Sequence, residues 1–258
     1  MSSHICQSIS LKGSTDLITE FFRYAVNAIL FQRGAFPADD FHIIKKYGQT
    51  VIITQDLALE SYLEQILKQI GTLLLSGVTQ LVVEIVSKDS RMPLEQWVFD
   101  VNLVEQSLLQ RSQPNKPEAK IQAEICSILR QIVSTVTFLP IIDEPTAFNI
   151  LVYTHGSADV PANKWLDTDL LAMEGSKSQD VKLRSFSTDV HRVEAMVLWY
   201  VKENSFIGNE LRKPRIGLMK IVSDIQSPHL QHAPTSPRYY PSATLGHRSW
   251  LIAILKIH

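Results

Sequence analysis

Three stretches of the chain repeat apolar residues three and four positions apart, which is the spacing of one helix face. They cover residues 14–31, 56–75 and 118–135. Ser14 or Thr15 is the expected cap of the first stretch, because a hydroxyl can accept a hydrogen bond from a free backbone N–H. The stripe expected to be buried in the third helix consists of Ile121, Ile125, Ile128, Leu129, Ile132 and Val136. The pattern predicts three amphipathic helices that face one core.

Shorter apolar runs have the character of strands. Trp97, Phe99, Val101 and Leu103 alternate with Val98, Asp100 and Asn102, which is the period of a half-buried strand, and residues 81–86 are rich in β-branched side chains. The polar turn between these two runs predicts a hairpin. Further strands are expected at Val51–Ile53, Phe148–Tyr153, Val181–Thr188 and His191–Val197. The predicted fold class is α+β, with three helices packed on one face of a mainly antiparallel sheet.

One long connection and one long tail lie outside this pattern. Residues 155–180 join two strands without a period of their own and include Trp165. We interpret them as a loop that becomes ordered on demand, because connections beyond about 12–15 residues are usually functional or disordered. Residues 201–258 hold 5 of the 12 prolines and 4 of the 8 histidines. We therefore predict a folded domain over residues 9–200 and a disordered Pro/His-rich tail over residues 201–258.

Charge changes sign between these two parts. Residues 1–200 carry 17 basic and 23 acidic side chains, a net of −6, whereas residues 201–258 carry 8 and 3, a net of +5. The whole chain has 25 against 26, so it lacks the basic field that attracts nucleic acid. The best candidate for a membrane span, residues 250–255, is far shorter than the ~20 residues required. We expect neither nucleic acid nor a membrane as a direct partner.

Sequence signals for catalysis are weak. Motifs that bind phosphates, dinucleotides or zinc are missing, as is the nucleophile-elbow motif. Cys126 lies beside the stripe of the third helix, where packing is the expected role. His191 is expected on the sheet surface, because Ser187 and Asp189 on the same strand do not make a triad with it. We predict no enzyme activity, no cofactor and no metal site, and the rival hypothesis is a small hydrolase that uses Cys126 and a histidine.

An ordered set of short sequences runs through the folded part. They are Leu11-Lys-Gly-Ser14, Phe21-Phe22, Gln32-Arg-Gly-Ala-Phe-Pro37, Lys46-Tyr-Gly48, Thr54-Gln-Asp-Leu57, Trp97-Val-Phe-Asp100, Arg130-Gln-Ile-Val-Ser-Thr-Val-Thr-Phe-Leu-Pro140, Val160-Pro161, Lys164-Trp165, Leu183-Arg-Ser-Phe-Ser-Thr188 and His191-Arg-Val193. In this order the set resembles the spindle-checkpoint members of the HORMA-domain family over about residues 9–197. Two other branches, the meiotic axis proteins and the translesion-polymerase adaptor, are less similar over residues 130–140 and stay as alternatives.

The resemblance implies a HORMA-type binding protein rather than an enzyme. In such a protein the C-terminal part, about residues 155–197 here, forms a mobile safety belt that closes over an extended partner peptide. The implied partners are a coiled-coil kinetochore receptor and the activator subunit of the anaphase-promoting complex, whose capture delays anaphase. Also implied are pairing of a closed with an open copy and reopening by an AAA-type ATPase with an adaptor. The implied location is the nucleus and kinetochore, and also the cytoplasm.

Matching positions assign residues to two surfaces. The dimer interface is expected at Arg33, Arg130, Gln131, Thr137 and Phe138. The partner-peptide and belt residues are expected at Phe148, Ile150, Val152, Trp165, Leu183, Phe186 and His191. The strand Phe148–Tyr153 is the candidate edge, because a strand added to a sheet gains main-chain hydrogen bonds. The family pattern ends near residue 197, so we expect the tail to be either lineage-specific or a product of intron read-through in gene prediction.

Overall fold

The computed structural model describes residues 9–104, 116–154, 166–167, 178–200 and 249–253. All of them belong to one compact unit of the chain, formed by residues 1–201 and 248–258. A second unit, residues 202–247, lies outside the described residues. The domain boundary near residue 200 stays a prediction.

Helix α1 (Leu11–Gln32) begins earlier than predicted. Ser10 caps it, because the Ser10 Oγ accepts a hydrogen bond from the Gly13 N–H at 3.1 Å. The predicted caps Ser14 and Thr15 are wrong, since both are buried within the helix. The early start places Ser14 inside the molecule, where it contacts a distant part of the chain.

Helix α2 (Leu57–Ser76) confirms the second predicted helix. The Asp56 carboxylate accepts a hydrogen bond from the Leu59 N–H at 2.7 Å and so caps the first turn. The helix ends at Gly77, whose φ of 106° is a left-handed conformation that a residue without a Cβ adopts at little cost.

Helix α3 (Glu118–Ser134) is followed by the short 3₁₀ helix η2 (Thr135–Thr137). The predicted stripe is buried from Ile121 to Ile132, but the prediction for Val136 is wrong, because this side chain is 52% exposed. The tighter winding of η2 turns Val136 away from the face that α3 presents to the core.

In the part of the chain that the structure describes, seven strands form one sheet in the order β6-β9-β5-β3-β4-β8-β7. All neighbouring pairs are antiparallel. The strands are β3 (Val78–Ser87), β4 (Pro93–Leu103), β5 (Thr146–Thr154), β6 (Leu166–Asp167), β7 (Ser178–Ser187), β8 (His191–Tyr200) and β9 (Ser249–Ala253). The hairpin predicted from residues 81–86 and 97–103 is confirmed as β3 and β4.

A separate hairpin consists of β1 (Phe41–Lys46) and β2 (Gln49–Thr54), preceded by the 3₁₀ helix η1 (Ala38–Asp40). Its two-residue turn, Tyr47-Gly48, has positive φ at both positions, as tight hairpin loops require. The sequence predicted only the core of β2. It missed β1 because the charged and polar residues at 42, 45 and 46 interrupt the apolar pattern.

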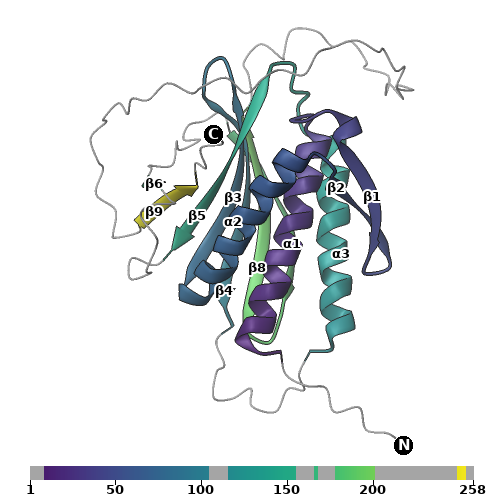
Figure 1. The fold of residues 1–258 in the computed structure, drawn as a ribbon, viewed down its shortest axis with the longest axis vertical. Coiled ribbons are helices and arrows are strands. Elements are labelled where there is room, and N and C mark those ends of the chain that lie inside the picture. Colours follow the sequence, from purple (N-terminus) through teal and green to yellow (C-terminus); the bar gives the residue numbers. More distant parts are fainter. Residues whose placement is uncertain (1–8, 105–115, 155–165, 168–177, 201–248, 254–258) are drawn as a thin grey trace, which may run out of the picture. The chain divides into compact units, whose positions relative to one another are not determined.

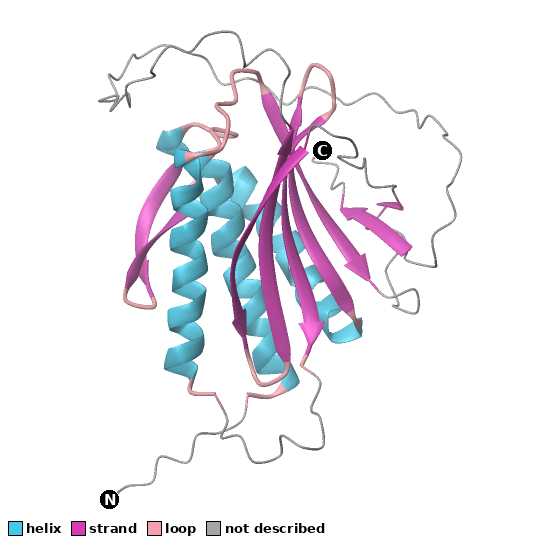
Figure 2. Ribbon diagram, turned by 180° about the vertical axis from the view of Figure 1, so that it is seen from behind, coloured by secondary structure: helices cyan, strands magenta, loops and turns pink. Residues whose placement is uncertain are grey.

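The three helices cover one face of the sheet (Figure 1), and the opposite face is seen from behind in Figure 2. Trp97 and Phe99 of β4 are fully buried beneath the helices. Phe21 and Phe22 of α1 both meet the Phe99 ring edge-on at a centroid distance of 5.6 Å. The predicted α+β architecture, with three helices on one face, is confirmed.

Strand β9 differs from the expectation for the tail. The sequence predicted no element in residues 201–258, because prolines interrupt every period in most of this stretch. The structure places Ser249–Ala253 in the sheet, next to β5. This segment follows the last proline and is mostly apolar, so it can form a strand when it pairs with the free edge of another strand, here β5. The rest of the tail lies outside the described residues.

Candidate functional site

Strand β5 has two different neighbours. It pairs with β3 at nine positions and, on its other side, with β9 at five, from Ile150↔Ala253 to Thr154↔Ser249. The outer edge of β5, the predicted peptide edge, therefore accepts an extended segment in antiparallel register. We call this outer side of residues 150–154 the β5 edge.

The side chains of β5 that were predicted to bind a peptide pack against the core of the domain. Ile150 and Val152 are fully buried in the core beneath the helices. Phe148 is half-buried and meets the rings of Phe36 and Tyr62 edge-on at 5.9 and 5.7 Å. These contacts fix the strand, while its backbone N–H and C=O groups form the β5 edge.

Strand β9 is also paired on its far side. The short strand β6 lies there, with Leu166 opposite Ile252 and Asp167 opposite Leu251. An extended segment is thus held between β5 and part of the predicted belt. Trp165 lies outside the described residues, as do residues 155–164 and 168–177, so the closing of the belt stays a prediction.

The two strands predicted at the end of the belt are confirmed as β7 and β8. We call them the belt hairpin. β8 pairs with β4 at nine positions, at the end of the sheet opposite to β9, and β7 has a register shift between Lys182 and Ser185. Phe186 is buried against Phe21 at a centroid distance of 5.0 Å, and Leu183 packs half-buried against the same core. β6 and β7 follow each other in the chain but lie at opposite edges of the sheet.

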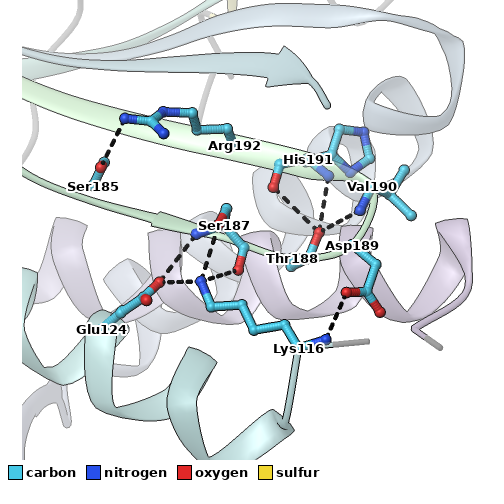
Figure 3. A network of polar contacts seen from close by, with 9 residues as sticks. All are labelled: Lys116, Glu124, Ser185, Ser187, Thr188, Asp189, Val190, His191 and Arg192. Carbon is cyan, nitrogen blue, oxygen red and sulfur yellow. Dashed lines mark hydrogen bonds and ion pairs between the residues drawn. The ribbon is translucent and has the colours of Figure 1, made fainter. Parts of the chain in front are cut away.

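Polar contacts tie the belt hairpin to α3 (Figure 3). The Lys116 ammonium donates to the Ser187 carbonyl oxygen at 2.9 Å and to its Oγ at 3.0 Å. The same ammonium forms an ion pair with the Glu124 carboxylate at 2.5 Å. The Asp189 carboxylate accepts a hydrogen bond from the Lys116 backbone N–H at 3.0 Å. These contacts hold the turn end of the belt hairpin against the start of α3.

His191 is part of a buried network, so the expected place on the sheet surface is wrong. Its Nδ1 lies 2.7 Å from the Ser14 Oγ, which lies 2.7 Å from the Thr188 Oγ1. The Thr188 Oγ1 also accepts a hydrogen bond from the His191 backbone N–H at 2.9 Å. Burial lowers the pKa of the His191 ring below its usual value, which favours the neutral form. The network links the turn of the belt hairpin to the first turn of α1 by hydrogen bonds.

Exposed side chains gather where α3 ends. Of the residues predicted for the dimer interface, Arg130, Thr137 and Phe138 are exposed, and Phe138 retains 47% of its accessible area. The Gln131 Oε1 accepts a hydrogen bond from the Arg184 backbone N–H of β7 at 2.7 Å. We call this region the α3 surface, and its residues are Arg130, Gln131, Val133, Val136, Thr137, Phe138 and Ile141.

Arg33, also predicted for the dimer interface, is buried rather than exposed. Its Nε donates to the Glu95 Oε2 at 2.9 Å, and its Nη2 donates to the Glu95 Oε1 at 2.5 Å and to the Pro140 carbonyl at 2.6 Å. Burial raises the pKa of the Glu95 carboxyl, although the Arg33 charge acts in the opposite direction. Arg33 therefore holds the chain that follows Phe138 in place from the inside.

The sequence profile of the HORMA domain matches residues 14–191, more than half of the chain. The chain belongs to the HORMA family. The chain is 44% identical over 200 residues to the mitotic spindle assembly checkpoint protein MAD2A of Dictyostelium discoideum, and the aligned part covers 76% of this chain and 96% of that protein. The mitotic spindle checkpoint component mad2 of Schizosaccharomyces pombe is 39% identical over 196 residues, covering 75% of this chain and 95% of that protein.

Solved structures agree with this assignment. A chain from the crystal structure of the Mitotic Checkpoint Complex is 37% identical, has a TM-score of 0.66, and covers 73% of this chain and 99% of that chain. The C. elegans protein HTP-1 bound to the HIM-3 closure motif is 12% identical with a TM-score of 0.55, covers 75% of this chain and 93% of that chain, and shares the fold. The predicted HORMA fold and spindle assembly checkpoint function are confirmed.

The described part of the HORMA domain offers little catalytic chemistry. Cys126 is buried, burial raises the pKa of its thiol, and its Sγ lies 3.8 Å from the Tyr47 carbonyl oxygen. Such a thiol is a poor nucleophile, which disfavours the hydrolase hypothesis. No group of three or more potential metal-ligating side chains occurs among the described residues. No helix among them is long and apolar enough to cross a membrane.

Sequence reasoning missed two parts of the site. The contact of Lys116 with Ser187 joins positions 71 residues apart and that of Ser14 with His191 joins positions 177 apart, so no local pattern indicates them. For β9 the sequence carries one signal, the apolar run of residues 250–255, which is too short for a membrane span but long enough for a strand.

Proposed function

We propose that this HORMA domain captures extended partner peptides along the β5 edge and holds them under the belt. The partners are a peptide of a coiled-coil kinetochore receptor and a peptide of the activator subunit of the anaphase-promoting complex. Capture of the activator inhibits the complex and delays anaphase. One observation carries the proposal: the β5 edge pairs with an extended strand that β6 covers from the other side.

The arrangement predicts slow exchange of a captured peptide. Each main-chain hydrogen bond contributes only about 0.5–1.5 kcal/mol net, so an uncovered strand of five residues exchanges quickly. A covered strand is released only after the belt opens. Opening has to separate the belt hairpin from β4 and α3, where Lys116, Glu124 and Ser187 are bound together.

We further propose that two copies associate through the α3 surface and that an AAA-type ATPase with an adaptor reopens the closed form. The exposed Phe138 and its apolar neighbours support the first proposal, because contiguous exposed apolar side chains mark interaction sites. The hydrogen bond between Gln131 and β7 supports communication between this surface and the belt hairpin. The protein would act in the nucleus, at the kinetochore and in the cytoplasm.

The test measures association and dissociation of fluorescently labelled receptor and activator peptides by fluorescence polarisation on the full chain. We expect slow association and very slow release. In the variant Lys116→Met, release should be at least tenfold faster, because the belt hairpin loses its charged tie to α3. Lys120→Met is the matched control, since Lys120 is an exposed lysine in the first turn of α3, four residues after Lys116.

Rapid exchange in the unmodified chain would contradict capture under a belt and leave a static binding domain. Equal acceleration by Lys116→Met and Lys120→Met would show that α3 charge alone, and not the tie to Ser187, sets the release rate.

A further inference from the structure

The segment that occupies the β5 edge belongs to this same chain. Its register is continuous, with Leu251 opposite Val152 of β5 and opposite Asp167 of β6. We infer that β9 is a built-in ligand, which latches the HORMA domain in the absence of a partner and competes with partner peptides for the β5 edge. This inference rests on the proposed function, because it assigns β9 and the partner peptides to the same edge.

The sequence of β9 suits an internal ligand. The run Ser249-Trp-Leu-Ile-Ala-Ile-Leu255 contains no charge, no proline and no glycine, whereas basic residues flank it at Arg248 and Lys256. Apolar, aromatic and β-branched residues are those that pair well on a sheet. An uncharged segment of this kind needs an edge or a core to cover it, and the β5 edge is where the structure places it.

The latch is short compared with the permanent strands. β9 pairs with β5 at five positions, whereas β3 pairs with β5 at nine and β8 pairs with β4 at nine. Its other neighbour, β6, adds two positions. A strand with fewer pairs opens more readily than its longer neighbours, as a ligand that must be exchanged has to do.

The chain is long enough for β9 to reach the edge within one molecule. Tyr200 ends β8, and β8 lies four strand positions from β9, a separation of about 19 Å at 4.8 Å per strand. Forty-eight residues, 201–248, connect the two strands, and a chain of that length can extend to roughly 160 Å. A tethered strand meets its own edge at an effective concentration of up to the millimolar range, so binding within one molecule outcompetes binding from a second copy at micromolar protein.

Such a latch reduces the apparent affinity for any partner by the fraction of molecules whose edge is free. Displacement of β9, and not the docking of the peptide itself, then limits how quickly a partner is captured. Weakening β9 should accelerate capture without changing any residue of β5 or of the belt.

The first experiment uses a labelled peptide with the sequence of residues 246–258 and compares three full-length proteins. In Leu251→Pro, proline removes a backbone N–H from a position that is paired on both sides. Thr235→Pro is the matched control, because it places a proline in a part of the tail that already contains Pro234 and Pro237. We expect the peptide to associate at least tenfold faster with Leu251→Pro than with the unmodified chain or with Thr235→Pro. Equal rates in all three proteins would overturn the inference.

A second experiment tests the contact directly. Thr154 and Ser249 are register partners, so Thr154→Cys/Ser249→Cys should form a disulfide in a Cys6→Ser background, because paired antiparallel positions lie within disulfide reach. We expect a monomeric disulfide that blocks peptide binding until a reductant is added. Thr154→Cys/Thr235→Cys serves as the control and should bridge more slowly. A disulfide-linked dimer would overturn the latch within one chain and assign β9 to a second copy.

Receptor and activator peptides separate this inference from the proposed function. If they bind the unmodified chain and Leu251→Pro equally fast, capture at the β5 edge stands and the latch is wrong. If they bind neither protein while the peptide of residues 246–258 binds Leu251→Pro, the latch stands and the proposed partners are wrong.

Discussion

Arg33, at the end of α1, and Glu95 of β4 form a bidentate salt bridge, with both side chains buried. Removing one partner of such a pair leaves a buried charge without its counterpart, which costs about 3–5 kcal/mol. We predict that Arg33→Met lowers the free energy of unfolding by about that amount. Urea unfolding followed by circular dichroism measures it.

The double variant Arg33→Met/Glu95→Leu is the control for this prediction. It replaces both charges with apolar side chains, so most of the lost stability should return. The single variant Glu95→Leu completes the cycle. If the losses of unfolding free energy in Arg33→Met and Glu95→Leu add in the double variant, the pair does not interact energetically and the prediction is wrong.

His191 should make stability depend on pH. Burial holds the pKa of its ring below the ~6.5 of an unfolded chain, so the unfolded state takes up a proton first as the pH falls. The stabilisation is complete above about pH 6.5 and is lost as the pH falls through the folded pKa. Urea midpoints at about pH 7.5 and 5.5 should therefore differ less in His191→Gln than in the unmodified chain. His42→Gln, at an exposed histidine of β1, should keep the full difference, and an equal reduction in both variants would contradict the assignment.

These individual contacts show where sequence reasoning ends. The helix stripes could be predicted because neighbours on a helix face are close in sequence, as Ile125 and Ile128 are. Ser14 and His191 are 177 residues apart, and their contact follows only from the way α1 packs against the hairpin turn. The burial of Arg33 likewise depends on a carboxylate 62 positions away.

Helix α3 presents one face to the core and its end to solvent, where the α3 surface lies. We predict that Arg130→Glu abolishes self-association without loss of peptide binding, because Arg130 is exposed and the buried stripe of α3 is unchanged. Light scattering gives the oligomeric state, and the peptide-binding assay checks that the domain remains folded.

Lys120→Glu is the control, since it introduces the same change of charge near the other end of α3. An oligomer that persists in Arg130→Glu, or a monomer produced by both variants, would show that self-association does not depend on the α3 surface.

Among the elements, those with a clear period were predictable and those without one were not. The period-2 pattern of β4 and the apolar stripe of α2 both recur over short distances in the sequence, so both elements could be predicted. β1 was missed because only Phe41 of its six residues is buried, so its pattern resembles a loop. β9 was not predictable because it forms a strand only against the edge that β5 offers, which depends on the arrangement of the whole sheet.

At the scale of the described domain, one sheet connects the β5 edge with the belt hairpin. The β5 edge lies at one end and the belt hairpin at the other, with β3 and β4 between them. β6, which pairs with β9 beside β5, is followed in the chain order of strands by β7 at the far end of the sheet. In the proposed function, this topology couples capture of a peptide at the β5 edge to the position of the belt hairpin.

The outermost strand at the far end, β7, has a consequence for the behaviour of the protein at high concentration. An open strand edge is a template on which further molecules can add and aggregate. Here the exposed side chains of Asp180, Lys182 and Arg184 and the register shift after Lys182 interrupt that template. The Gln131 side chain also occupies the Arg184 N–H, a donor that an incoming strand would need. Growth of aggregates by strand addition is therefore disfavoured at this edge even in crowded solution.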